Sequence, residues 1–413
     1  MSDLFAPITL PNGVELSNRL CKAAMEENLS VEGQVPGDRL ECLYRQWSVG
    51  GVGLILTGNV MVSPDALTGP GGIVLQKDQA LMPFKKWAQA AKSGGASVWM
   101  QLNHPGRQVY ASMGEQALAP SPIAVSIKGF ESLFAKPRAL TDNEIQDIIQ
   151  RFTDSAMLAE QAGFDGCQVH AAHGYLISQF LSPLTNQRND QWGGRLANRA
   201  RLLFEVIKYI RENVGSSFCV SVKLNSADFQ KGGFNQTEAS WVVDQLNYMG
   251  VDLVELSGGS YESPAMQGRA SKDSTGEREA YFVEFAKDIA EVATMPVMVT
   301  GGIRKHAVAL KTLDDAGISL LGIGRAMAFV TDLPNKWQAG EQLTVELPTL
   351  NWKNKTLAAL AVMAITKAQL QRLSKGLPNK SKVNPLIVII SDRLRNYLKT
   401  KRYRRWRNLH SEG

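Results

Sequence analysis

The sequence predicts a fold of the α/β class: a closed (β/α)8 barrel, or TIM barrel, with an N-terminal β-hairpin cap and a basic, helical C-terminal extension. Eight short apolar runs typical of strands alternate with segments of helical period over about 330 residues, which indicates parallel βα units. One barrel of about 250 residues with insertions has this size. We expect residues 1–345 to form the barrel and residues 346–413 to form the extension.

Each element follows from a local pattern. Residues 4–20 alternate apolar and polar side chains around Pro11-Asn12-Gly13, a hairpin signal, and this hairpin is expected to cap a larger unit. Strands are expected at residues 20–25, 52–58, 97–102, 166–170, 219–224, 252–257, 296–301 and 320–324. Helices are expected at residues 38–49, 82–93, 142–163, 197–214, 237–250, 278–293 and 306–317. A doubly wound open sheet is the alternative, but no G-x-G-x-x-G turn follows the first strand.

The charge of the chain is unevenly distributed. Residues 351–413 hold fifteen Lys or Arg against two acids, which leaves thirty bases and thirty-seven acids in residues 1–350 of a chain with net charge +6. The basic character therefore belongs to the extension, and a nucleic-acid-binding function of the whole protein is not expected. Residues 354–374 have helical period with an apolar face, which predicts a helix packed on the barrel or on another subunit.

Targeting and redox signals are weak. The chain has no apolar run of eighteen residues, and its N-terminus lacks the order of a signal peptide, so we expect a cytoplasmic protein. Four cysteines are scattered without C-x-x-C spacing, which predicts reduced thiols rather than disulfides or an iron–sulfur cluster.

The richest stretch for chemistry is GCQVHAAHGY, a buried strand pattern that ends in His170, His173 and Tyr175. A helical zinc site would place two histidines four residues apart with a Glu between them, so no metal site is expected. The two imidazoles are better suited to hold a substrate by hydrogen bonds at the exit of the strand. The phenol of Tyr175 is then a candidate proton donor.

Other candidate residues lie at the ends of predicted strands, where barrel enzymes place their active sites. Met25 and Glu26 end the first strand, Gln101 the third and Lys223 the fifth. The last two strands end in VTGGIR and GIGRAM, which contain Gly301, Gly302, Gly324 and Arg325. Backbone N–H groups at such turns approach anions closely, and the loops after strands seven and eight of barrels frequently bind phosphate. We therefore expect a phosphate group here.

These motifs together resemble the old yellow enzyme family of FMN-dependent ene-reductases and NADH:flavin oxidoreductases. The resemblance rests on NRLCKAAM, MQLNHPGR, VHAAHGYLISQFLSPLTNQRND with WGGRLANRARLLFEVI, VKLNSADF, VTGGIR and GIGRAM, in the order of the family, and covers residues 4–337. It implies a barrel that holds one non-covalent FMN, reduced by NADH or NADPH. It implies reduction of the C=C bond of an electron-poor alkene, such as an α,β-unsaturated carbonyl or nitro compound, by hydride transfer from flavin N5.

The resemblance also implies roles for individual residues. Ala23, Ala24 and Met25 would pack along the flavin with Gly58 nearby, Gln101 would bond the pyrimidine edge, and Lys223 would lie beside the N1 and C2 carbonyl side. Gly301, Gly302, Gly324 and Arg325 would take the phosphate. His170 and His173 would hold the carbonyl or nitro oxygen, and Tyr175 would protonate the α-carbon.

The sequence departs from the family pattern at Glu26, where the family commonly has Thr or Cys bonding the flavin carbonyl. A carboxyl group here is expected either to be protonated, so that it can donate a hydrogen bond, or to be turned away from the flavin. Asn28 stands where some members have tyrosine, which leaves substrate preference open.

Several alternatives remain at this level. The chemistry could be that of a flavin-dependent amine dehydrogenase, a general NADH:flavin oxidoreductase or a non-enzymatic flavin-binding barrel. Related dehydrogenases and dienoyl-CoA reductases carry a cysteine cluster after the barrel, and no cysteine follows Cys219. The basic residues after Gly376 are interleaved with Tyr397, Tyr403 and Trp406. They are compatible with contact with an anionic membrane surface, which would make the protein peripheral to the membrane, and equally with a solvated tail or contact between subunits of a homo-oligomer.

Overall fold

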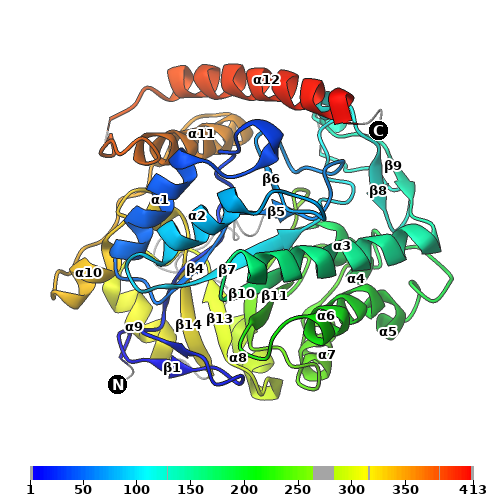
Figure 1. The fold of residues 1–413 in the computed structure, drawn as a ribbon, viewed down its shortest axis with the longest axis horizontal. Coiled ribbons are helices and arrows are strands. Elements are labelled where there is room, and N and C mark those ends of the chain that lie inside the picture. Colours follow the sequence, from blue (N-terminus) through cyan, green and yellow to red (C-terminus); the bar gives the residue numbers. More distant parts are fainter. Residues whose placement is uncertain (1–2, 128, 264–282, 315–316, 381, 411–413) are drawn as a thin grey trace.

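Eight parallel strands close into a barrel in the computed structural model, which describes residues 3–127, 129–263, 283–314, 317–380 and 382–410 (Figure 1). In chain order they are β3 (Leu20–Lys22), β4 (Leu54–Leu56), β7 (Ser97–Asn103), β10 (Gly166–Ala171), β11 (Cys219–Asn225), β12 (Leu253–Ser257), β13 (Val297–Thr300) and β14 (Ile318–Ile323). The sheet closes because β10 pairs with both β11 and β7. The predicted barrel is confirmed, and closure excludes the open doubly wound sheet.

Helices surround the barrel. They are α1 (Asp38–Val49), α2 (Met82–Lys92), α3 (Asp142–Gln161), α4 (Leu176–Leu181), α5 (Leu196–Arg199), α6 (Arg201–Asn213), α7 (Gln236–Leu246), α8 (Val283–Val292), α9 (His306–Asp314) and α10 (Leu333–Gln338). The predicted helix at residues 197–214 is divided in two at Ala200. Residues 278–282 and 315–316 of two predicted helices lie outside the described residues.

Local sequence explains where these helices begin. Thr141 caps α3 by accepting a hydrogen bond from the Glu144 N–H, and the Glu144 side chain bonds back to the Thr141 N–H. Asn235 and Glu238 form the same reciprocal capping box at α7. Each box satisfies two backbone donors that the first turn of a helix otherwise leaves unpaired.

The N-terminal hairpin covers the amino-terminal end of the barrel, as predicted. Its strands β1 (Ile8–Thr9) and β2 (Glu15–Leu16) are antiparallel, and Gly13 adopts the positive φ of 85° that the turn requires. Leu10 and Leu16 pack into a buried cluster with Trp99, Leu253 and other residues from the barrel strands. The hairpin therefore fills the end of the barrel opposite the predicted site.

Insertions build up the carboxyl-terminal end of the barrel. β5 (Val60–Met61) and β6 (Ile73–Val74) extend the sheet beside β7, and β8 (Ala117–Ala119) pairs with β9 (Pro137–Ala139). Short 3-10 turns lie in the loops that follow β3, β7, β8 and β14: η1 (Glu32–Gln34), η2 (Ala111–Met113), η3 (Glu131–Leu133) and η5 (Arg325–Ala328).

The C-terminal extension consists of two helices, α11 (Lys355–Leu373) and α12 (Pro385–His410), which cross the carboxyl-terminal side of the barrel (Figure 1). The helix α11 packs on the barrel, which is one of the two arrangements that the sequence predicts. Arg39 of α1 donates to Gln371 Oε1 and to Ser374 Oγ, each at 2.7 Å. Neither of these helices, nor any other in the described part of the chain, is long and apolar enough to cross a membrane.

Candidate active site

A cavity of about 880 Å³ opens at the carboxyl-terminal ends of the barrel strands. This volume lies within the range of pockets for small molecules and cofactors. Among the residues that the structure describes, ten of the fourteen predicted site residues line it: Ala23, Ala24, Met25, Glu26, His173, Lys223, Gly301, Gly302, Gly324 and Arg325. The tertiary structure thus brings together residues from five strand ends that are up to 302 positions apart in the sequence.

Close packing keeps the first strand's loop at the cavity. β3 ends at Lys22, three residues before the predicted end, so Ala23 to Glu26 leave the sheet and reach the cavity as a loop. Gly58, which is not part of the lining described, lies directly behind this loop. A Cβ on Gly58 would come within 2.2 Å of the Met25 carbonyl oxygen and 2.1 Å of Glu27 Oε2, so only glycine allows the loop to approach.

The two glycine turns leave room for an anion. Gly301 and Gly302 have φ values of 154° and 72°, which glycine adopts without strain. A Cβ on Gly324 would meet no atom of the described residues within 4 Å, so this turn faces open space inside the cavity. Arg325 lines the same space. Glycine turns beside a guanidinium suit a phosphate group, as the sequence predicts.

A prediction for Arg325 follows from this fit. Replacing Arg325 with Ala removes a charge-assisted contact with phosphate and is expected to weaken FMN binding by about 1.5–3 kcal/mol, roughly 10–150-fold. Riboflavin, which has no phosphate, should bind the variant and the wild type equally. Fluorescence titration of apoprotein with both flavins measures this, and Arg45→Ala on the exposed face of α1 is the matched control. An equal loss for riboflavin would contradict a phosphate contact.

A buried chain of hydrogen bonds positions Lys223. Its Nζ lies 2.7 Å from Glu255 Oε1, and Gln168 Nε2 donates to the other carboxylate oxygen at 2.9 Å. Gln101 Nε2 in turn donates to Gln168 Oε1 at 2.7 Å. These four side chains come from β11, β12, β10 and β7. Gln101 is therefore linked through buried side chains to Lys223, which lines the cavity. Glu255 is a positioning residue that the sequence did not reveal.

His170, His173 and Tyr175 converge at the end of β10. The His170 ring centroid lies 5.0 Å from that of His173 and 4.8 Å from that of Tyr175. His173 Nε2 lies 2.7 Å from Ser257 Oγ, and its backbone N–H donates to Asn225 Oδ1 at 3.1 Å. Its φ of 59° is unusual for a residue with a Cβ and directs the ring into the cavity.

Burial keeps both histidines neutral. It lowers the pKa of His170 well below the usual value, and the nearby His173 and Lys223 lower it further. Burial and Lys223 likewise lower the pKa of His173. His170 Nδ1 accepts a hydrogen bond from the Ala172 N–H at 3.2 Å, so the proton of the neutral ring is on Nε2. That N–H group is available to donate.

The structure adds a second phenol, Tyr261, whose hydroxyl lies 3.0 Å from the Tyr175 hydroxyl. Burial raises the pKa of Tyr175 above its ordinary value, and the negative charge of Glu26 raises it further. Burial also raises the pKa of Tyr261. Both phenols are therefore protonated at neutral pH. The sequence contained no signal for this pair, because Tyr261 lies in the irregular stretch SGGSYES, 86 residues after Tyr175.

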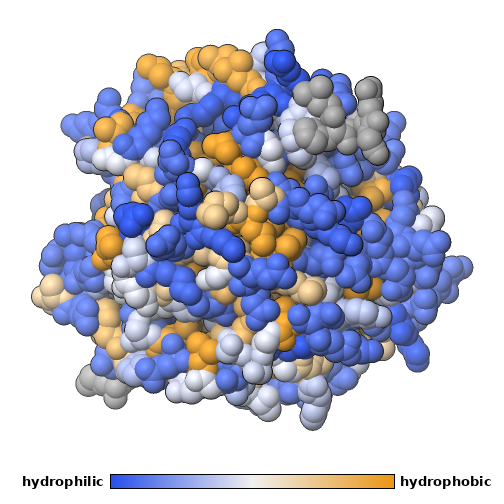
Figure 2. Space-filling view, viewed as in Figure 1, coloured by the Kyte–Doolittle hydropathy of each residue, from blue (hydrophilic) through white to orange (hydrophobic). Residues whose placement is uncertain are grey.

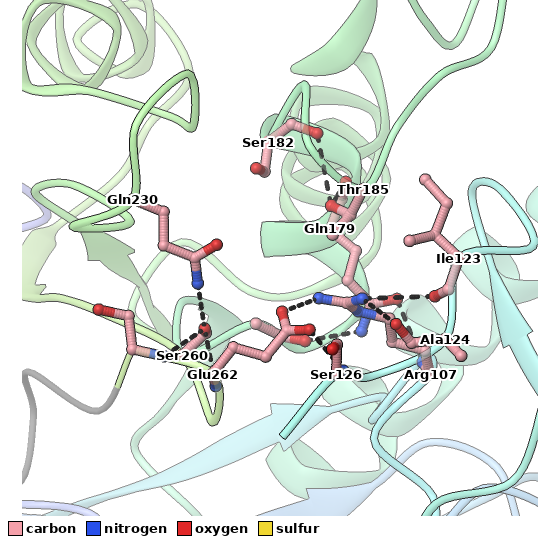
Figure 3. Close-up of polar contacts among 12 residues, drawn as sticks. Arg107, Ile123, Ala124, Ser126, Gln179, Ser182, Thr185, Gln230, Ser260 and Glu262 are labelled. Carbon is pink, nitrogen blue, oxygen red and sulfur yellow. Dashed lines mark hydrogen bonds and ion pairs between the residues drawn. The ribbon is translucent and has the colours of Figure 1, made fainter. Parts of the chain in front are cut away.

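Polar contacts hold the loop that carries Tyr261 on both sides of it (Figure 3). On one side, Ser260 Oγ accepts from Gln230 Nε2 at 3.2 Å. On the other, Glu262 forms an ion pair with Arg107 and accepts from the Ser126 N–H at 2.7 Å. Arg107 also donates to the Ala124 carbonyl at 2.9 Å. The loops after β7 and β12 are thus tied together around the phenol pair.

Glu26 lines the cavity and accepts a hydrogen bond from Thr68 Oγ1 at 2.5 Å. Thr68 belongs to the loop between β5 and β6. The carboxyl group is therefore satisfied by a partner from the barrel's own insertion.

The extension forms the outer wall of the cavity, which the sequence analysis did not foresee. The lining from α11 and the segment before it is Pro348, Thr349, Leu350, Asn351, Ala358, Ala359, Val362, Met363, Thr366, Lys367 and Leu370. The helical period of residues 354–374 indicated an apolar face, but not the surface on which that face packs.

Comparisons with known proteins agree with this geometry. Residues 3–344 match the model of the NADH:flavin oxidoreductase / NADH oxidase family. The chain is 36% identical over 363 residues to the NADH-dependent flavin oxidoreductase iliE of Hypocrea jecorina, covering 81% of this chain and 89% of that protein. It is also 36% identical over 330 residues to the NADH oxidase of Thermoanaerobacter brockii, covering 79% of this chain and 49% of that protein.

Solved structures of old yellow enzyme relatives have the same fold. Morphinone reductase superposes with a TM-score of 0.70 at 25% identity, covering 84% of this chain and 91% of that chain. The old yellow enzyme homologue from Zymomonas mobilis also gives a TM-score of 0.70, at 24% identity, covering 83% and 94%. Since the family model matches most of its length, this chain belongs to the NADH:flavin oxidoreductase / NADH oxidase family, that of the old yellow enzymes, and is an FMN-dependent oxidoreductase that takes its electrons from a nicotinamide.

Proposed function

We propose that the protein reduces the C=C bond of activated alkenes, such as α,β-unsaturated carbonyl or nitro compounds, at the expense of NADH or NADPH. The observation that carries this proposal is the convergence of two neutral imidazoles with a pair of protonated phenols beside the cavity that contains Lys223. Neutral imidazole N–H groups suit a carbonyl or nitro oxygen, and a phenol suits the delivery of a proton to carbon.

Each residue then has one task. When bound, FMN supplies hydride from N5 to the β-carbon of the alkene. Lys223, held by Glu255, would provide a fixed positive charge beside the flavin ring, while Gly302, Gly324 and Arg325 would hold the phosphate. His170 and His173 would bind and polarise the substrate oxygen, which stabilises the negative charge that develops there. Tyr175 would donate the proton to the α-carbon.

Product analysis tests the proposal. Purified holoenzyme with NADH or NADPH and cyclohexenone under anaerobic conditions is expected to form one cyclohexanone for each nicotinamide oxidised. Nicotinamide oxidation that reduces only free flavin or oxygen, with no ketone formed, would leave a general NADH:flavin oxidoreductase. Turnover of an amine with a dye acceptor, without alkene reduction, would instead make the protein a dehydrogenase.

The shifted pKa values predict a broad pH profile for the alkene step. The pKa of each histidine is lowered, so both imidazoles remain neutral as the pH falls through about 6.5, the ordinary histidine value. The pKa of Tyr175 is raised, so its proton remains as the pH rises through about 10. Stopped-flow reoxidation of the reduced enzyme by cyclohexenone should therefore be flat between about pH 6 and 10. A fall centred on the ordinary value of either group would contradict these assignments.

Tyr261 is expected to orient the Tyr175 hydroxyl rather than to react itself. Tyr261→Phe removes the hydrogen bond between the two phenols and should slow alkene reduction by about 2–10-fold, corresponding to about 0.5–1.5 kcal/mol. The solvent isotope effect on this step should rise as proton delivery becomes more limiting, which a purely structural role would not cause. Tyr209→Phe on α6 removes an exposed hydroxyl and is the control. An unchanged isotope effect in Tyr261→Phe would contradict this role.

A further inference from the structure

The outer face of α12 is an exposed apolar stripe that the barrel leaves uncovered. Six large apolar side chains with 56–67% exposure lie at helical spacing along this face: Leu386, Ile387, Ile390, Leu394, Tyr397 and Leu398. Figure 2 shows hydrophobic atoms gathered along the upper edge, where the first half of α12 lies in Figure 1. Soluble surfaces seldom keep so many large apolar groups together in one patch without a partner.

The inner face of the same helix is anchored to the barrel by Lys399, Arg402 and Tyr403. Tyr403 is completely buried in a cluster that includes Met61, and its hydroxyl donates to the Pro64 carbonyl at 2.7 Å. Lys399 and Arg402 donate to the backbone carbonyls of Asn28 and Ser30. The barrel therefore holds α12 in a fixed rotation about its axis. The apolar stripe faces outward as a consequence of this docking, not because the helix is loose.

The charges beside the stripe indicate what covers it. Residues 384–410 contain eight Lys or Arg and one acid, Asp392. Lys401 and Arg405 are exposed and continue the outer face beyond Leu398, at the same helical spacing. Tyr397, within the stripe, is of a residue type enriched at membrane interfaces. An apolar stripe beside a basic segment is the pattern of a helix that lies in the plane of an anionic lipid surface.

A second copy of the chain fits less well. The stripe spans twelve residue steps of one helix, or about 18 Å by about 10 Å, which is much smaller than a stable interface of about 800 Å² per partner. Pairing two copies would also bring two strongly basic helices together. Anionic headgroups would neutralise the same charges.

We propose that the stripe on α12 docks the protein on anionic membranes, with the helix in the plane of the lipid surface and the carboxyl-terminal side of the barrel facing it. The sequence suggested membrane contact by the basic residues after Gly376 as a whole, whereas this proposal assigns it to one face of α12. Lys399 and Arg402 bond the barrel, whereas the stripe with Lys401 and Arg405 meets the lipid. It does not depend on which substrate the active site reduces.

Vesicle co-sedimentation of the full-length, FMN-loaded protein tests this. Wild type is expected to bind vesicles containing phosphatidylglycerol, and to bind pure phosphatidylcholine at least tenfold more weakly. Ile390→Asp/Leu394→Asp should lower binding to the anionic vesicles by at least tenfold, and Lys401→Glu/Arg405→Glu should abolish the preference for them. The matched control, Val49→Asp/Tyr248→Asp, places the same charges at exposed apolar positions elsewhere and should bind as wild type does.

Folding of each variant is checked by its melting temperature and its NADH oxidation, which surface substitutions should leave unchanged. Wild type that stays in the supernatant with anionic vesicles would overturn the proposal, as would undiminished binding of Ile390→Asp/Leu394→Asp. A wild-type dimer that this variant converts to monomer, without vesicle binding, would assign the stripe to a second copy and would also overturn it.

Discussion

Replacing Tyr175 with Phe is expected to slow alkene reduction by about 10²–10⁴-fold, the usual contribution of a positioned general acid. Reduction of the flavin by NADH should remain at the wild-type rate, because that step takes no proton from this phenol. The substitution removes one oxygen atom and leaves the ring packed against His170, 4.8 Å away between centroids. The fold and the substrate pocket should therefore be preserved.

Separate stopped-flow measurements of the two half-reactions distinguish these effects. The rate of reduction by NADH and the rate of reoxidation by cyclohexenone are compared between wild type and Tyr175→Phe. Tyr248→Phe removes the same atom at an exposed position and is the control. A reoxidation rate within twofold of wild type would remove Tyr175 from the mechanism. Equal losses in both half-reactions would indicate damage to the flavin site instead.

Replacing Glu27 with Ala is expected to destabilise the protein by about 3–5 kcal/mol, the usual cost of breaking a buried ion pair from one side. Lys22 is completely buried, and its Nζ lies 3.4 Å from Glu27 Oε1. Tyr44 also donates to this carboxylate oxygen at 2.6 Å. Burial lowers the pKa of Lys22, and Glu27 opposes that shift. Without Glu27, the ammonium group would lose its counter-charge while remaining out of water.

This cluster also supports the active site. Glu27 follows Glu26 directly, and its carboxylate lies against Gly58, behind the loop that lines the cavity. Chemical denaturation of the apoprotein measures the loss, with Glu32→Ala, an exposed acid, as the control expected within about 0.5 kcal/mol of wild type. The double substitution Lys22→Met/Glu27→Leu should recover much of the stability, because apolar groups of similar size often replace a buried pair without loss. Wild-type stability in Glu27→Ala would show that the pair contributes nothing.

The barrel and most of the cavity lining that the barrel itself contributes were predictable because their signals are local. Apolar runs recur eight times, most of them end in polar residues or glycines, and parallel closure then places those strand ends on one rim. Ala23 to Glu26, Lys223 and Arg325 were assigned to the cavity in this way. The loop position of Ala23 to Glu26 was not predicted, because the apolar run continues past the point where β3 stops pairing.

The residues that the sequence did not reveal have partners far away in the chain. In the sequence, Glu255 is an ordinary acidic residue of a predicted strand, and only the register between β11 and β12 places it beside Lys223. Tyr261 is placed beside Tyr175 by a loop in which the neighbouring Glu262 bonds Arg107, 155 residues before Glu262 in the sequence. Neither contact has a sequence period, because the first depends on the register of two strands and the second on how two loops meet.

The C-terminal extension shows most clearly which features the sequence determines and which depend on tertiary contacts. The sequence by itself determined that residues 354–374 form a helix and that the chain after it is basic, because composition and period are properties of the chain alone. Only the tertiary structure decided that α11 lines the cavity, and that α12 turns Lys399, Arg402 and Tyr403 toward the barrel and its apolar stripe outward. A helix has faces that its sequence defines, but which face is buried depends on the surface that receives it.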